Sequence, residues 1–168
     1  MSTDSVASET STLKIGDTAP DFTLPVANKD MVGGQASFTL SEYRGKKNVV
    51  VVFYPFAWTP VWTVQMPAYN ADLAKFEGYD AQVVGISIDS AASNSAWAKS
   101  LGGLDYPLLS DFFPHGEVIQ KFGVLRKEGM AERAIFIIDK EGKVTYIDVH
   151  DISKQPDNED LFEVLRKL

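Results

Sequence analysis

The strongest indication of the fold of this chain is the segment Asn48-Val-Val-Val-Val-Phe-Tyr-Pro55. Its β-branched and aromatic residues follow one another without polar alternation, a pattern typical of a central strand that is covered on both faces. Proline ends the strand because it has no amide to donate to a sheet. Thr59 and Pro60 then predict a helix, since threonine can cap a free amide and proline suits the first helical position. We expect this helix over residues 60–76, with a kink at Pro67.

Strands and helices alternate on either side of this stretch. Downstream, the patterns predict strands over residues 82–88, 106–109, 134–138 and 144–149, and helices over residues 90–101, 116–122 and 158–168. Upstream, residues 22–24 and 36–40 are expected to pair as a hairpin, followed by one helical turn at residues 41–45. Strands that alternate with helices favour a parallel sheet, and the last two strands favour an antiparallel hairpin. This order predicts an α/β, thioredoxin-like fold with a central mixed sheet flanked by helices and an N-terminal β-hairpin extension.

The length and composition fit one domain. A chain of 168 residues buries a substantial core without help from metals or disulfides. Residues 1–12 are rich in serine and threonine and have almost no large apolar side chains, so we expect a disordered tail there. The single domain is then expected over residues 13–168.

The charge and residue content exclude several classes of function. The 16 basic and 23 acidic residues give a net charge of −7, which argues against a nucleic-acid binder. No apolar run is long enough to span a membrane, and the N-terminus lacks the features of a secretory signal, so we expect a cytoplasmic protein. The chain contains no cysteine, which excludes disulfides, thiolate metal sites and thiol catalysis. Neither a metal-binding motif nor a cofactor fingerprint is present, so we expect no metal and no cofactor.

The segment from Pro55 to Thr63 resembles the active site of the peroxiredoxins. In that family a strand ends in proline, three variable residues lead to a threonine, and two more lead to the cysteine that attacks peroxide. Pro55, Thr59 and position 62 fall on this spacing, but position 62 is tryptophan. The resemblance runs over residues 14–168 and looks closest to the one-Cys and bacterioferritin-comigratory-like subgroups. Further similar segments are residues 16–22, 41–45, 85–90, 106–111 and 133–139.

The resemblance implies an activity and a set of partners. The activity is the thiol-dependent reduction of hydrogen peroxide and organic hydroperoxides in antioxidant defence. The partners are a peroxide substrate, a thiol reductant and further copies of the same chain, in a homodimer or a larger homo-oligomer. No nucleic-acid or membrane partner is implied.

The resemblance also assigns roles to individual positions. Position 62 lies in the first helical turn, where free amides and the helix dipole lower the pKa of a cysteine. Arg133 matches the arginine that holds the thiolate and a peroxide oxygen. Thr59 matches the threonine whose hydroxyl binds peroxide, and Pro55 matches the proline that shields the site from water. Gln65 is expected to support these groups from the next turn.

Trp62 stands where the family has its reactive cysteine. An indole has no ionisable nucleophile and no sulfur that could become sulfenic acid, so we expect this chain not to turn over peroxide. An indole is also far bulkier than a thiol. Because overpacking a tight site costs about 1–3 kcal/mol, we expect residues 61–63 to unwind or to swing outward.

Structural explanations are open for each residue taken alone. Pro55 is then more simply a strand terminator, Thr59 a helix cap and Arg133 the partner of a surface carboxylate. His115 and His150 are not expected to be catalytic, because the chain offers no nucleophile for them to activate.

Three hypotheses for the function stay open. In the first, the reactive cysteine of an antioxidant thiol peroxidase has been replaced by tryptophan in the laboratory, and the retention of Pro55, Thr59 and Arg133 favours it. In the second, the chain is a natural pseudoenzyme that keeps the fold for binding or assembly. In the third, an unrelated enzyme uses the same pocket, but the sequence offers it neither a nucleophile nor a metal cluster. The aromatic segment 56–58 is a candidate dimer contact.

Overall fold

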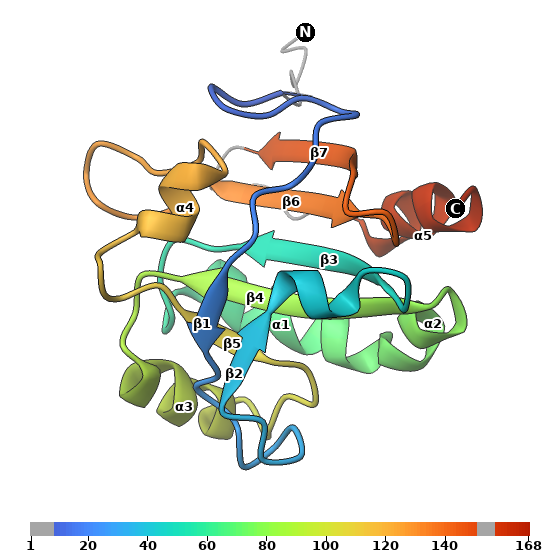
Figure 1. Cartoon of the computed structure of the whole chain (residues 1–168). Coiled ribbons are helices and arrows are strands. Elements are labelled where there is room, and N and C mark those ends of the chain that lie inside the picture. The colour runs from blue at the N-terminus through green and yellow to red at the C-terminus, as the bar shows by residue number, and fades with distance from the viewer. Residues whose placement is uncertain (1–8, 151–156) are drawn as a thin grey trace, which may run out of the picture.

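A five-stranded mixed sheet forms the centre of the computed structural model, in which residues 9–150 and 157–168 are described (Figure 1). The strand order is β5-β4-β3-β6-β7. The strands are β3 (Asn48–Phe53), β4 (Ala81–Ser87), β5 (Leu108–Ser110), β6 (Arg133–Ile138) and β7 (Val144–His150). β3 pairs in parallel with β4 and antiparallel with β6, so the expected mixed sheet is confirmed.

β3 lies at the centre of the sheet, as its sequence predicts. Every residue of the strand is buried. Its side chains alternate between the faces, with Val51 and Phe53 in the core on one side and Val52 in the core on the other. A strand that is apolar on both faces needs a covering layer on each, and the molecule supplies both layers.

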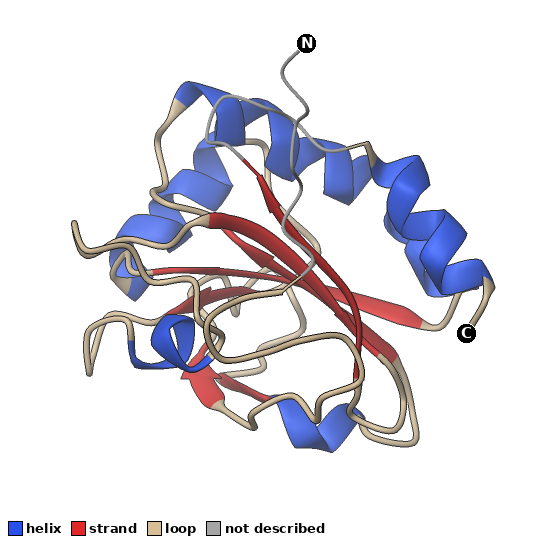
Figure 2. Ribbon diagram, turned by 90° about the horizontal axis from the view of Figure 1, so that it is seen from above, coloured by secondary structure: helices blue, strands red, loops and turns tan. Residues whose placement is uncertain are grey.

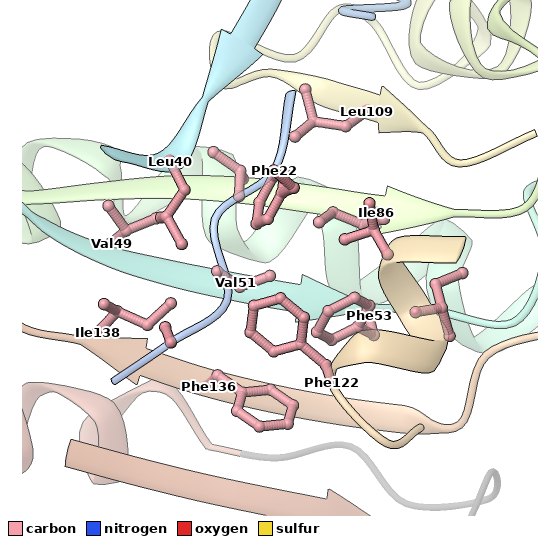
Figure 3. Close-up of a cluster of buried hydrophobic side chains, with 14 of the residues drawn as sticks. Phe22, Leu40, Val49, Val51, Phe53, Ile86, Leu109, Phe122, Phe136 and Ile138 are labelled. Carbon is pink, nitrogen blue, oxygen red and sulfur yellow. The ribbon is translucent and has the colours of Figure 1, made fainter. Parts of the chain in front are cut away.

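The N-terminal hairpin and two short helices cover one face. β1 (Thr23–Pro25) and β2 (Ser37–Thr39) pair antiparallel, which confirms the expected hairpin, and the 3-10 helix η1 (Leu40–Tyr43) is the expected helical turn. The hairpin lies in front of the sheet together with α4 (Glu117–Lys121), as Figure 1 shows. Aromatic rings from both layers meet in this core (Figure 3), namely those of Phe22, Phe53, Phe122 and Phe136.

Longer helices cover the opposite face, so that helices lie on both sides of the sheet (Figure 2). They are α1 (Pro60–Ala71), α2 (Leu73–Gly78), α3 (Ala91–Ser100) and α5 (Asn158–Arg166), and each places side chains in the second core. Within the described residues, no helix is both long and apolar enough to cross a lipid bilayer.

The single helix expected over residues 60–76 is divided in two. The interruption falls at Asp72, whose amide is shared between the carbonyls of Ala68 at 3.3 Å and Tyr69 at 3.2 Å. Such a shared bond tightens the last turn of a helix. Pro67 lies inside α1, where its missing donor does not end the helix, and the kink expected there stays a prediction.

Contacts of the N-terminal segment begin before residue 13, where composition places the start of the domain. The Thr10 hydroxyl donates to the Phe122 carbonyl at 2.9 Å, and the Thr12 hydroxyl donates to the Lys121 carbonyl at 2.8 Å. These bonds hold residues 9–12 against the end of α4. The segment has few apolar side chains to bury, and the threonine hydroxyls attach it instead. The rest of the predicted tail, residues 1–8, lies outside the described residues.

Candidate functional site

The loop between β3 and α1 carries the candidate site. Two hydrogen bonds fix this loop to the segment that follows β4. The Ala57 amide donates to Asp89 Oδ2 at 2.9 Å, and Trp58 Nε1 donates to Ser93 Oγ at 3.1 Å. Trp58 has a φ of 69°, a left-handed conformation that is costly for a bulky residue. The surrounding contacts therefore hold the shape of the loop.

Thr59 occupies the N-cap position of α1 with an extended backbone. Its hydroxyl donates to the Phe56 carbonyl at 3.0 Å and makes no cap hydrogen bond, so the prediction of a side-chain cap was wrong. The loop folds back far enough to bring its own carbonyl to the hydroxyl, and this bond replaces the cap. The Thr59 proton is consequently engaged within the loop.

Trp62 is buried in an intact helix, with 2% of its surface exposed. The expectation that its bulk would unwind residues 61–63 was therefore wrong. The indole finds room because it packs against the Tyr54 ring, at 5.7 Å between centroids, and against the Arg133 guanidinium, whose Cζ lies 4.8 Å from the ring centroid. Cation–π contacts of this kind contribute about 0.5–2 kcal/mol and offset part of the overpacking cost.

Arg133 opens β6 and is buried, with 1% exposed. Its Nη2 donates to Gln65 Oε1 at 2.7 Å, and Gln65 Nε2 in turn donates to the Tyr69 hydroxyl at 2.8 Å. Burial raises the pKa of Tyr69, so this hydroxyl stays protonated. Arg133 is therefore buried and not at the surface, and the supporting position expected for Gln65 is confirmed.

A second polar cluster lies beside Arg133 on β7, and the sequence interpretation missed it. The strand register pairs Arg133 with His150 and Ile135 with Asp148, which places these side chains on the same face. Asp148 accepts a hydrogen bond from the Tyr146 hydroxyl at 3.1 Å and contacts His150 Nδ1. Burial raises the pKa of Asp148. The signal in the sequence was the alternation of polar residues at positions 146, 148 and 150 of the strand.

One pocket joins three of the four predicted site residues. It has a volume of about 300 Å³. Its lining consists of Pro55, Phe56, Thr59, Pro60, Val61, Trp62 and Met130. The fourth predicted residue, Arg133, does not line the pocket and instead contacts the Trp62 ring. Trp62 therefore stands between the pocket and the guanidinium.

The chemistry available in this pocket is limited by position 62. The chain has no cysteine, and the indole of Trp62 is not an ionisable nucleophile. Within residues 9–150 and 157–168, no group of three or more His, Asp or Glu side chains gathers closely enough to hold a metal ion. The pocket can enclose an apolar group, but its lining residues cannot attack one.

This chain is similar to proteins of a known family. The AhpC/TSA family profile matches residues 15–147. An alkyl hydroperoxide reductase E of Mycobacterium tuberculosis is 38% identical over 145 residues, covering 86% of this chain and 88% of that protein. The crystal structure of peroxidoxin BcpB from Mycobacterium tuberculosis superposes with a TM-score of 0.78 at 31% identity, covering 93% of this chain and 98% of that one. The reduced 2-Cys peroxiredoxin of Plasmodium vivax superposes with a TM-score of 0.82 at 25% identity, covering 90% and 80%.

Proposed function

This chain belongs to the AhpC/TSA family of peroxiredoxins, and on that premise we propose that it is a peroxide-reductase scaffold which, with Trp62 in place, does not reduce peroxide. One observation carries the proposal. The indole of Trp62 occupies the first turn of α1 and packs on Arg133, where the family mechanism requires a thiolate.

The family reaction shows what the missing atom would do. A cysteine thiolate attacks the terminal peroxide oxygen, forming an S–O bond while the O–O bond breaks. The leaving oxygen takes a proton to become water or an alcohol, and the cysteine becomes sulfenic acid. Two thiols of a reductant then return the cysteine and release water. Here the first turn of α1 and Arg133 would stabilise the negative charge in both steps, but position 62 has no thiol to carry it.

The test is to restore the thiol. Trp62→Cys is expected to consume hydrogen peroxide and cumene hydroperoxide with dithiothreitol as the thiol donor, and dimedone should trap its sulfenic acid. Trp62→Ser is the matched control, because serine has nearly the size of cysteine without its sulfur. Sustained peroxide consumption by the unaltered chain above the buffer rate would overturn the proposed inactivity.

The origin of Trp62 is a separate part of the proposal. Pro55, Thr59 and the Gln65–Arg133 hydrogen bond are all retained around it. An abandoned site is free to drift at each of these positions, so their retention supports replacement of the cysteine in an engineered variant. The alternative is a natural pseudoenzyme that binds or assembles, and the covered guanidinium and apolar pocket favour it. An inert Trp62→Cys variant that folds normally would decide for this alternative.

We propose that a second copy of the chain binds at the edge of the sheet that carries the candidate site. Exposed aromatic residues follow the carboxyl ends of the parallel strands β3 and β5 and therefore gather at one edge. They include Trp58, which is 55% exposed, and Phe113, which is 86% exposed. Apolar surface of this kind is typical of protein interfaces. Sedimentation of the chain and of a Trp58→Ser/Phe113→Ser variant should show weaker self-association in the variant.

The cytoplasmic location expected from the sequence stays a prediction.

A further inference from the structure

We infer that the pocket beside Trp62 binds a small, uncharged, apolar molecule of about the size of one aromatic ring. This binding needs neither a peroxide nor a thiol. It is therefore independent of the proposed function, and each can fail without the other.

The lining of the pocket offers only apolar surface to a ligand. Phe56, Val61 and Met130 supply side chains from the loop, from α1 and from the segment before β6. Thr59 is the one hydroxyl residue in the lining, and its proton is already donated to the Phe56 carbonyl at 3.0 Å. A polar ligand would lose its bonds to water and find few replacements, which disfavours it.

The buried guanidinium of Arg133 is withheld from the pocket. Arg133 is 1% exposed, donates to Gln65 and has the indole of Trp62 against its guanidinium. An anion that enters the pocket would therefore be desolvated without a direct counter-charge, and the energetic cost of that is high. This arrangement selects a neutral ligand over an anionic ligand of the same shape.

The size of the pocket sets the size of the ligand. Small-molecule sites start at about 300 Å³, and an apolar cavity of about 150 Å³ in another protein suffices for benzene. The volume here, about 300 Å³, holds one substituted ring. Phe56 is 37% exposed, so the ligand has a path from solvent. Stacking on the edge or face of Phe56 and Trp62 would add to the burial of apolar area.

Methionine methyl groups report on this binding directly. The full chain contains four methionines, so ¹³C-methyl labelling gives a short spectrum. Met130 lines the pocket, whereas Met31 lies on a different part of the chain and serves as the internal reference. Titration with toluene is expected to shift the Met130 signal saturably and to leave Met31 unchanged. Benzoate, which has a similar ring and a negative charge, is expected to bind at least tenfold more weakly.

Two variants on one helix test the location. Val61→Phe fills the pocket from α1 and is expected to weaken toluene binding at least tenfold. Val64→Phe adds the same bulk to the same helix at a position that is 62% exposed and outside the pocket, and it should bind as the unaltered chain does. If Val61→Phe does not fold, Met130→Trp fills the pocket from the opposite wall, and saturation transfer to toluene replaces the methionine signal.

Three results of the toluene experiments would overturn the inference, and a fourth result would replace the proposed ligand. They are a linear shift of Met130 and Met31 together, equal binding of benzoate and toluene, and unchanged toluene binding in the folded filled variant. A decline of toluene affinity with protein concentration would instead assign the pocket to an aromatic side chain of a second copy. That result would also overturn the proposed small-molecule occupant.

Discussion

On one face of the central sheet the buried side chains are mostly apolar, with Asp111 beside α4, while on the other face an arginine, a glutamine and an aspartate are buried among apolar residues. The first, the apolar face, packs β1, β2 and α4 around rings such as Phe53 and Phe136. The second, the site face, packs α1 and α5 around Arg133, Gln65 and Asp148 as well as apolar residues. An apolar core depends only on filled volume, whereas a buried polar group depends on a particular partner. The two faces should therefore respond differently to substitution.

The largest loss of stability is expected from a substitution on the apolar face. Phe136→Ala removes a buried ring that contacts Phe53 and Phe122 at 5.6 Å and 5.1 Å between centroids. The free energy of unfolding should fall by about 3–5 kcal/mol, because the variant loses apolar burial and leaves a cavity. Urea unfolding measures this loss. Ile15→Ala is the control, since its side chain is 53% exposed, and a Phe136→Ala cost as small as the control's would contradict the prediction.

On the site face, the loss of unfolding free energy should depend on which hydrogen-bonding partner stays buried after the substitution. Gln65→Leu removes the acceptor of Arg133 Nη2 and the donor to Tyr69, and should cost about 1–3 kcal/mol of unfolding free energy. Combined with Arg133→Met, the cost should be clearly smaller than the sum of the two single costs, because the guanidinium that loses its Gln65 acceptor is itself removed. Urea unfolding of the four chains gives this coupling. Simple additivity would show that the two side chains act independently.

A smaller effect should appear in the pH dependence of the unfolding free energy, through Asp148 on the site face. Burial raises the pKa of Asp148 above its ordinary value of 3.8. The folded chain then holds this proton more tightly than the unfolded chain, so stability falls as pH rises from 3.8 towards the folded-state pKa. Asp148→Asn removes that fall, and its stability relative to the unaltered chain should rise by up to about 1.4 kcal/mol per pH unit in this window.

Urea unfolding between pH 3.5 and 7 measures the difference between the two chains. The groups that face Asp148 are Tyr146 and His150 on β7, Tyr69 on α1 and Asp160 on α5. They are the same in both chains, so the difference reports the ionisation of Asp148 together with its interaction with His150. A stability difference that is flat, or that falls with pH, would show that its carboxylate is not disfavoured by burial.

The smallest effect is expected in the loop that carries the site. Ser93→Ala removes the acceptor of Trp58 Nε1, an exposed bond, and should lower the unfolding free energy by about 0.5 kcal/mol or less. Its local effect should be clearer, with faster hydrogen exchange of the Ala57 amide. Ser95→Ala on the same helix is the control. Equal exchange rates in both variants would show that this bond does not hold the loop.

Much of the fold was predictable because it depends on neighbours along the chain. The apolar run of β3, its end at Pro55 and the start of α1 at Pro60 follow from local propensity and backbone chemistry. The spacing of Pro55, Thr59 and Trp62 was visible in the same way, and these residues do meet in one pocket. The interruption of the helix at Asp72 was not predictable, because Pro67 offered a stronger local signal for the irregularity.

The order of the elements, the burial of β3 and the absence of a thiol at position 62 all follow from the order of residues along the chain. The direction of the Trp62 side chain, the groups around Arg133 and the carbonyl that accepts from the Thr59 hydroxyl depend on the folded arrangement. The two sets of features differ in the distance along the chain over which they arise. Strand and helix patterns arise between residues a few positions apart, whereas Trp62 meets Arg133 only because β3 and β6 are adjacent strands. That long-range contact accommodates the indole, and it separates the guanidinium from the pocket.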